Sequence, residues 1–119
     1  VDRTNPRVAD LYDTLHPAVL MAVKQIYQAC IEMNKPVTVC GELAGDPLGV
    51  LLLLGMGYRA FSMSGSSLLK VKWLVRNITM QKAEQLLKEV SLMDNGRVIR
   101  SHVELFLQKE GLLRFLSTA

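Results

Sequence analysis

Hydrophobic residues recur at two different spacings along the chain, and this alternation separates helical from extended segments. Residues 1–15 are polar and interrupted by proline, which predicts a loop. Pro17 suits the first turn of a helix, because the N–H that proline lacks would be unpaired there in any case. The apolar residues after it are three or four positions apart, which predicts an amphipathic helix ending near Asn34. These residues are Val19, Ala22, Val23, Ile26, Cys30 and Met33.

Two short segments have the composition of buried strands. Residues 37–40 are mostly β-branched and lie between a proline and a glycine, and residues 60–64 follow as a second short extended segment. Between them, Asp46 and Pro47 are suited to the N-cap and first position of a helix. That helix is apolar nearly all round over residues 48–54, so we expect it to be buried on several sides before it ends at the Gly55-Met56-Gly57 turn.

The remainder of the chain is expected to be helical. One helix is predicted from residue 65 to about 76, and Thr79 is suited to cap another. Asp94-Asn95-Gly96 predicts a turn, and Gly111 should interrupt the last helix near its end. The apolar faces of the last two helices are Ala83, Leu86, Leu87 and Val90, and then Val98, Ile99, Val103, Phe106 and Leu107.

The order of elements indicates an α/β class. Strands separated by helices predict a parallel sheet with right-handed crossovers. Two short parallel strands are not stable alone, since such strands need both faces covered and neighbours at both edges. We therefore expect residues 1–119 to form one portion of a larger α/β domain, mostly helical when seen alone, with no separate second domain. The polar start without an initiator methionine agrees with an interior start.

Composition and charge narrow the function classes. The chain has 119 residues, of which 50% are hydrophobic and 21% charged, and its net charge is +3. Its lysines and arginines are spread out, with the densest cluster at Lys70, Lys72 and Arg76, so nucleic-acid binding is not favoured. No apolar run approaches the roughly 20 residues that cross a bilayer. With no secretory signal, Cys30 and Cys40 are expected to be reduced thiols of a cytoplasmic protein.

Cys40 is the main candidate for chemistry. In a parallel α/β barrel, reactive side chains come from the C-terminal ends of strands and the loops after them. Cys40 ends the first predicted strand and is followed by glycine, but it could equally be a small buried hydrophobic residue. Cys30 is expected to pack on its helix. We expect Glu42 to support the loop and Asp46 to cap the next helix.

Neither histidine indicates a catalytic triad. His16 precedes Pro17 and is expected to cap or pack against the helix start, and His102 is expected at the surface. The glycine-containing segments 55–57 and 65–67 lack the lysine of a phosphate-binding loop, so they are predicted to be turns.

Several segments carry a resemblance to a known family. They are residues 40–46 (CGELAGD), 53–58 (LLGMGY), 61–64 (FSMS) and the opening Val1-Asp2-Arg3. They resemble the C-terminal end of Enzyme I, the phosphoenolpyruvate–protein phosphotransferase of the bacterial phosphotransferase system, and the resemblance covers essentially the whole chain. Residues 11–18 and 57–59 are closer to its nitrogen-related branch. Residues 43–46 differ from the related pyruvate phosphate dikinase, which usually continues with His-Gly-Gly, and from phosphoenolpyruvate synthase.

The resemblance implies a fold, an activity and site residues. The fold is an eight-stranded (β/α) TIM barrel that binds phosphoenolpyruvate, with residues 37–40 and 60–63 as its last two strands. Cys40 matches the family's general acid, which protonates the enolate of pyruvate after the phosphoryl group has moved to a histidine on a separate domain. Arg3 matches an arginine that holds the phosphate of phosphoenolpyruvate.

The resemblance also implies partners and missing parts. A histidine-containing phosphocarrier protein accepts the phosphoryl group in this family, the barrel forms homodimers, and Mg²⁺ is the cofactor. The Mg²⁺ ligands and the phosphorylated histidine match positions before Val1, so the residues present are not expected to catalyse the transfer alone.

Two alternatives remain open from the sequence. The chain could be a non-catalytic helical module for dimerisation or regulation, since amphipathic helices predominate. A thiol-redox protein using Cys30 and Cys40 is less favoured, because their spacing matches no redox motif.

Overall fold

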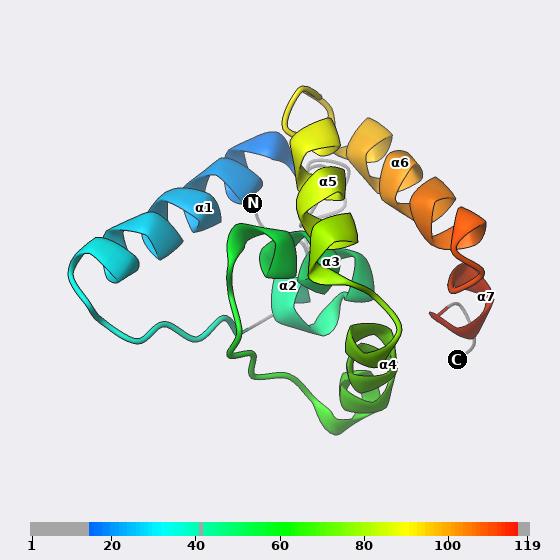
Figure 1. Ribbon diagram of the computed structural model, residues 1–119, viewed down its shortest axis with the longest axis horizontal. Coiled ribbons are helices and arrows are strands. Elements are labelled where there is room, and N and C mark those ends of the chain that lie inside the picture. The colour runs from blue at the N-terminus through cyan, green and yellow to red at the C-terminus, as the bar shows by residue number, and fades with distance from the viewer. Residues whose placement is uncertain (1–14, 41, 117–119) are drawn as a thin grey trace, which may run out of the picture.

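The computed structural model describes residues 15–40 and 42–116, with only the backbone of residues 42, 115 and 116. Helices dominate the described residues, and loops join them (Figure 1). In chain order they are α1 (Pro17–Glu32), α2 (Glu42–Gly45), α3 (Pro47–Met56), α4 (Gly65–Arg76), α5 (Met80–Val90), α6 (Gly96–Lys109) and α7 (Leu113–Leu116).

Helix α3 lies at the centre of the molecule (Figure 1). Its residues 48–54 are all buried, which confirms the predicted burial on several sides. Helix α3 contacts α1, α2, α4, α5 and α6, and its contact with α5 is the most extensive. At its C-terminal end Gly57 adopts a φ of 119°, a left-handed conformation that favours glycine. Helices α1, α2, α4, α5 and α6 are therefore positioned by what they bury against α3.

Helix α1 begins at Pro17 as predicted, and its N-cap is His16. The backbone N–H of Ala18 donates to Nδ1 of His16 at 3.0 Å, so the predicted capping role of this histidine is confirmed. The Tyr58 hydroxyl after α3 donates to the Val23 carbonyl at 2.6 Å, which ties α1 to the end of α3.

The apolar face predicted for α1 is only partly buried. Leu20 is the buried residue of this helix, and Val23 and Tyr27 pack partly against the core. Four residues of the predicted face are exposed: Val19, Ala22, Ile26 and Met33. The buried stripe is thus rotated from the predicted one, because Tyr27 packs with Tyr58 at a ring-centroid distance of 4.9 Å.

The last two long helices bury the predicted faces in part. Ala83, Leu86 and Val90 of α5 are buried, as are Ile99, Val103 and Leu107 of α6, whereas Val98 is half exposed. Thr79 caps α5 by accepting from the Lys82 N–H at 3.3 Å, as predicted.

The predicted turn at residues 94–96 has a more specific role. Oδ1 of Asn95 accepts from the N–H groups of Arg97 and Val98, so Asn95 is the N-cap of α6. The side-chain oxygen of an N-cap pairs backbone donors that would otherwise lack partners.

The two predicted strands are not formed in the described part of the chain. One parallel bridge joins Val39 and Phe61. The Val39 N–H donates to the Ala60 carbonyl at 3.1 Å, and the Ser62 N–H donates to the Val39 carbonyl at 2.8 Å. A parallel ladder needs neighbours at both edges, and no further extended segment lies beside these residues in the described structure. The parallel direction of the pairing agrees with the prediction, but in the described residues the pairing is a single bridge and does not extend into two strands, and the short helix α2 was missed.

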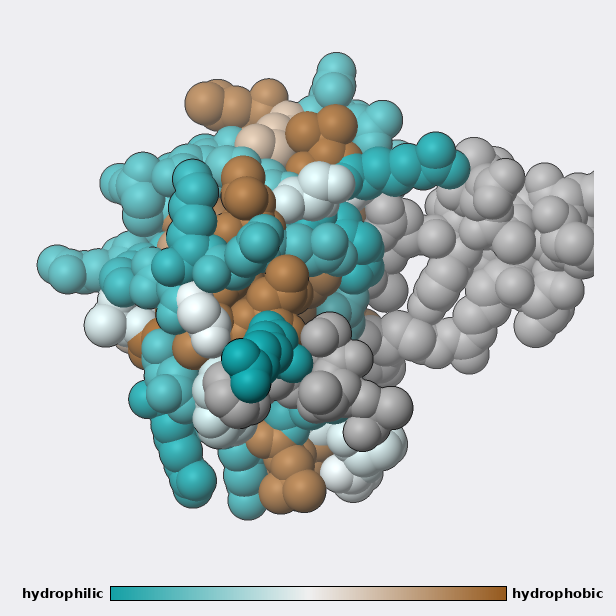
Figure 2. Space-filling model, turned by 90° about the vertical axis from the view of Figure 1, so that its right-hand side faces the viewer, coloured by the Kyte–Doolittle hydropathy of each residue, from teal (hydrophilic) through white to brown (hydrophobic). Residues whose placement is uncertain are grey.

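Charged and polar groups dominate the face formed by α6 and α7. Figure 2 shows hydrophilic side chains over this face, with apolar side chains reaching the surface between them. None of the helices in residues 15–40 and 42–116 is long and apolar enough to cross a bilayer.

Candidate functional site

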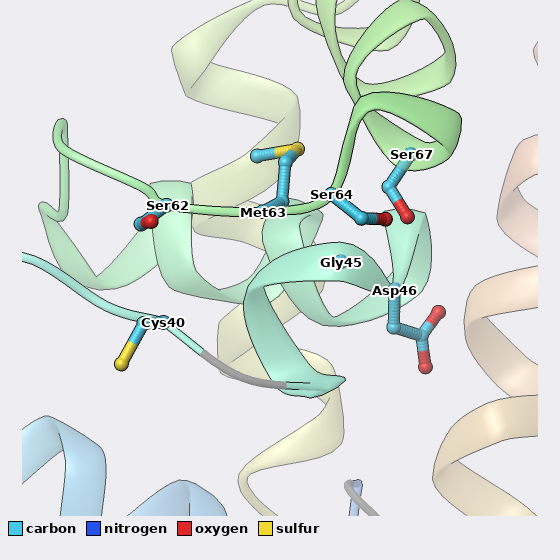
Figure 3. A pocket seen from close by; sticks show the side chains of 7 residues that line it. All are labelled: Cys40, Gly45, Asp46, Ser62, Met63, Ser64 and Ser67. Atoms are coloured by element: carbon cyan, nitrogen blue, oxygen red, sulfur yellow. The ribbon is translucent and has the colours of Figure 1, made fainter.

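The parallel bridge brings together the two segments that carry the candidate site. Cys40 directly follows Val39, and Ser62 directly follows Phe61, so both residues leave the bridge in the same direction. An open hollow of about 560 Å³ lies beside them (Figure 3). Its lining residues are Cys40, Gly45, Asp46, Ser62, Met63, Ser64 and Ser67.

The Cys40 thiol is exposed to solvent. The alternative of a small buried hydrophobic residue is therefore wrong for Cys40. Cys30 is partly buried on α1, and both cysteines are free thiols.

Serine residues supply most of the polar groups on the other side of the hollow. Ser64 is the N-cap of α4, and its Oγ lies 3.0 Å from the Oγ of Ser66. Ser67 lies in the first turn of α4 and approaches Gly45 closely, since a Cβ built on Gly45 would be 3.2 Å from the Ser67 hydroxyl. Close packing of α2 on α4 thus sets the width of the hollow at this point.

Asp46 connects the hollow to two helices. Its Oδ1 accepts from the Leu48 N–H at 3.1 Å, which confirms the predicted N-cap of α3. Its Oδ2 accepts from Nη2 of Arg100 at 2.9 Å. In Figure 3 the Asp46 carboxylate points toward α6, whereas the Cys40 sulfur lies at the other end of α2. The sequence analysis missed Arg100, because 54 residues separate it from Asp46 and no local pattern links them.

The structure does not describe two of the side chains that were predicted to act near the site. Arg3 lies outside the described residues. Glu42 begins α2, but its side chain is not described, so its expected support of the loop stays a prediction.

His102 is not the simple surface residue that was expected. It is partly buried, and its Nε2 lies 2.6 Å from Oε1 of Glu89 on α5. Hydrogen bonding by His102, then by Gln85, lowers the pKa of Glu89. This pair joins α5 to α6 and lies apart from the residues that line the hollow.

The chemistry available in the hollow is that of a thiol, hydroxyls and a carboxylate. Within residues 15–40 and 42–116, no group of three or more histidine, cysteine, aspartate or glutamate side chains is placed to hold a metal ion. Serine hydroxyls and peptide N–H groups can bind a small polar or anionic molecule, and a thiol can give it a proton.

Comparisons with known proteins place this chain in a family. A family model described as "PEP-utilising enzyme, PEP-binding domain" matches residues 1–80. The chain is 40% identical over 112 residues to "Phosphoenolpyruvate-dependent phosphotransferase system" of Salmonella typhimurium, covering 94% of this chain and 15% of the relative. It is 40% identical over 112 residues to "Phosphoenolpyruvate-protein phosphotransferase" of Haemophilus influenzae, covering 94% of this chain and 20% of the relative.

A third relative matches over a similar length. The "Phosphoenolpyruvate-protein phosphotransferase" of Borreliella burgdorferi is 37% identical over 107 residues, covering 90% of this chain and 19% of the relative. The chain thus spans a fifth or less of the length of these relatives. On this evidence the chain belongs to the PEP-utilising enzyme family and is similar to the C-terminal part of phosphoenolpyruvate–protein phosphotransferases.

Proposed function

We propose that this chain forms the C-terminal part of the barrel domain of a phosphoenolpyruvate–protein phosphotransferase. In that enzyme the phosphoryl group of phosphoenolpyruvate moves to an enzyme histidine and then to a histidine-containing phosphocarrier protein. Cys40 is the general acid of the first step. The observation that carries the proposal is the exposed Cys40 thiol, which lines the hollow directly after the bridge.

In the step proposed for Cys40, the thiol supplies the proton that converts the enolate of pyruvate into pyruvate. When the phosphoryl group moves to the histidine, the bond between phosphorus and the enol oxygen of phosphoenolpyruvate breaks, the oxygen keeps the electron pair and the product is the enolate of pyruvate. The methylene carbon of the enolate then takes the proton from the thiol, which forms the methyl group of pyruvate and a thiolate. Solvent returns a proton to the thiolate. A thiol can supply this proton because it is a far stronger acid than a hydroxyl.

We propose that residues 1–119 all belong to a (β/α)8 barrel, with residues 37–40 and 60–63 as its last two strands. The parallel bridge between Val39 and Phe61 has the direction that a barrel requires. Exposed apolar residues of α1, such as Met21 and Ile26, would be covered by other barrel elements or by the second subunit of a homodimer.

The other groups that the proposed active site needs would come from residues that the structure does not describe. Arg3 would hold the phosphate of phosphoenolpyruvate, since a guanidinium group can bind two phosphate oxygens at once. The described residues do not fit a Mg²⁺ site, so no step here depends on the metal. The protein is proposed to act in the cytoplasm and to belong to the nitrogen-related branch.

Substitution of Cys40 tests the proposal. In the full-length protein, we expect Cys40→Ala to abolish pyruvate formation from phosphoenolpyruvate, and Cys40→Ser to lower it by about 10²–10⁴-fold, because a hydroxyl is a far weaker acid. Exchange of the pyruvate methyl protons with D₂O, followed by NMR, should be lost in parallel, since it needs the same acid–base group.

Cys30→Ala is the matched control, because Cys30 is the chain's other thiol and does not line the hollow. It should leave pyruvate formation and methyl exchange near the level of the unmodified protein. Undiminished turnover in Cys40→Ala would remove Cys40 from the mechanism and favour the alternative, a non-catalytic helical module for dimerisation or regulation.

A further inference from the structure

Different hydrogen bonds hold the chain before α2 and the chain at the end of α2. The chain before Cys40 is held by the bridge at Val39. The end of α2 is held by Asp46, whose N–H donates to the Leu43 carbonyl at 3.4 Å and whose carbonyl accepts from the Val50 N–H at 2.9 Å. Asp46 therefore closes α2 and opens α3 at the same residue. A displacement of its side chain would change the wall of the hollow formed by Gly45 and Asp46.

Both oxygens of the Asp46 carboxylate accept hydrogen bonds. Oδ1 accepts from the Leu48 N–H and Oδ2 accepts from Arg100. Rotation about the side-chain bonds would break both hydrogen bonds, so the two partners together select one orientation. The cap holds Asp46 to its own helix, whereas Arg100 is a partner from another element, α6.

Helix α6 is held in the core on both sides of this arginine. Ile99 precedes Arg100 and Val103 follows one turn later, and both side chains are fully buried in the core. The side chain of Arg100 is 36% exposed and that of Asp46 is 19% exposed. A pair with this much solvent contact contributes little to global stability, so its main effect is on geometry.

We propose that Arg100 is a positioning residue, which acts through Asp46 to hold the α2 wall of the hollow against Cys40. The inference deepens the proposed function, since it assigns the far C-terminal helix α6 a role in that reaction. A wall displaced by about 1 Å places the enolate carbon badly for proton transfer, and such misplacement costs up to about 10²-fold in rate. Substrate affinity should change less, because the phosphate would be held by other groups.

The test uses the full-length protein and a double-mutant cycle. Arg100→Ala should lower kcat for pyruvate formation by about tenfold with a much smaller change in KM. Asp46→Asn keeps an oxygen that can cap α3 but removes the charge that Arg100 contacts, so its kcat should fall by a similar factor. The double variant should be no worse than either single variant, because the two residues act as one unit. Arg100→Lys should recover part of the rate, since it restores a charge without the planar fork.

Lys82→Ala is the matched control. Lys82 on α5 pairs with Glu110 at 2.5 Å in another exposed ion pair between elements, and neither residue lines the hollow. It should leave kcat unchanged. An Arg100→Ala enzyme with the kcat of Lys82→Ala, or additive losses in the cycle, would overturn the positioning role.

Hydrogen exchange of residues 42–48 separates this inference from the proposed function. Arg100→Ala and Asp46→Asn should both speed exchange in this segment, whereas Lys82→Ala should not. Exchange rates that do not respond would overturn the inference even if Cys40 is the acid. Full pyruvate formation by Cys40→Ala would overturn the proposed function, while a shared exchange response would still support Arg100 as the residue that positions Asp46.

Discussion

The contact between α3 and α5 depends on a glycine, and its replacement gives a quantitative test of the packing. A Cβ built on Gly55 would lie 2.6 Å from the carbonyl oxygen of Ala83, about 0.8 Å short of the 3.4 Å at which ordinary contact begins. The obstacle is backbone and cannot rotate away. Helix α5 would have to move away from α3, and this would open the most extensive helix contact of the described structure.

The cost of Gly55→Ala follows from two opposing effects. Overpacking a well-packed site costs about 1–3 kcal/mol, since neighbouring contacts lengthen when the helices separate. Alanine regains at most about 1 kcal/mol of helix propensity over glycine. We therefore expect the free energy of opening α3 and α5 to fall by about 1–2 kcal/mol, which corresponds to exchange of their backbone amides faster by about 5–30-fold.

Hydrogen exchange of the α3 and α5 amides in the full-length protein measures this change. Gly65→Ala is the matched control, because a Cβ on Gly65 at the start of α4 meets no atom within 4 Å. It should leave exchange in α3 unchanged. Equal exchange in Gly55→Ala and Gly65→Ala would refute the close approach of α5 to α3.

Two further predictions concern contacts at the ends of the helices. Gly57→Ala should loosen the contact between α1 and α3, because residue 57 has a φ of 119° and a Cβ there would lie 2.5 Å from the ring of Tyr27. Faster hydrogen exchange of the α1 backbone amides would show this. Glu89 has a folded-state pKa below its usual value of 4.5, caused first by His102 and then by Gln85, so its contribution to stability is present above pH 4.5 and is lost as the pH falls through the lowered pKa. Thermal unfolding against pH should show Glu89→Gln lacking this acid-side loss, and identical profiles would contradict it.

The sequence predicted the helices well, because the signals for them are local. Pro17, Asp46 and Thr79 begin helices in the structure as their side-chain chemistry requires. The strands failed for a different reason: residues 37–40 and 60–64 have strand composition, but a parallel ladder depends on neighbours that the described residues do not contain. The order of the elements thus predicted the direction of pairing, whereas the extent of pairing depends on longer-range contacts.

The same distinction explains which parts of the site the sequence could predict. Cys40 was identified because the end of a strand followed by glycine is a local pattern, and the bridge places it beside Ser62. Arg100 has no such pattern, since α6 reaches Asp46 only after α3, α5 and α6 have packed together. An acidic N-cap is already explained by its own helix, so nothing in the sequence calls for a second partner. Side chains that cap a helix and also line a hollow are therefore positions where a distant partner should be sought in the structure, because one carboxylate oxygen remains for it after the cap is made.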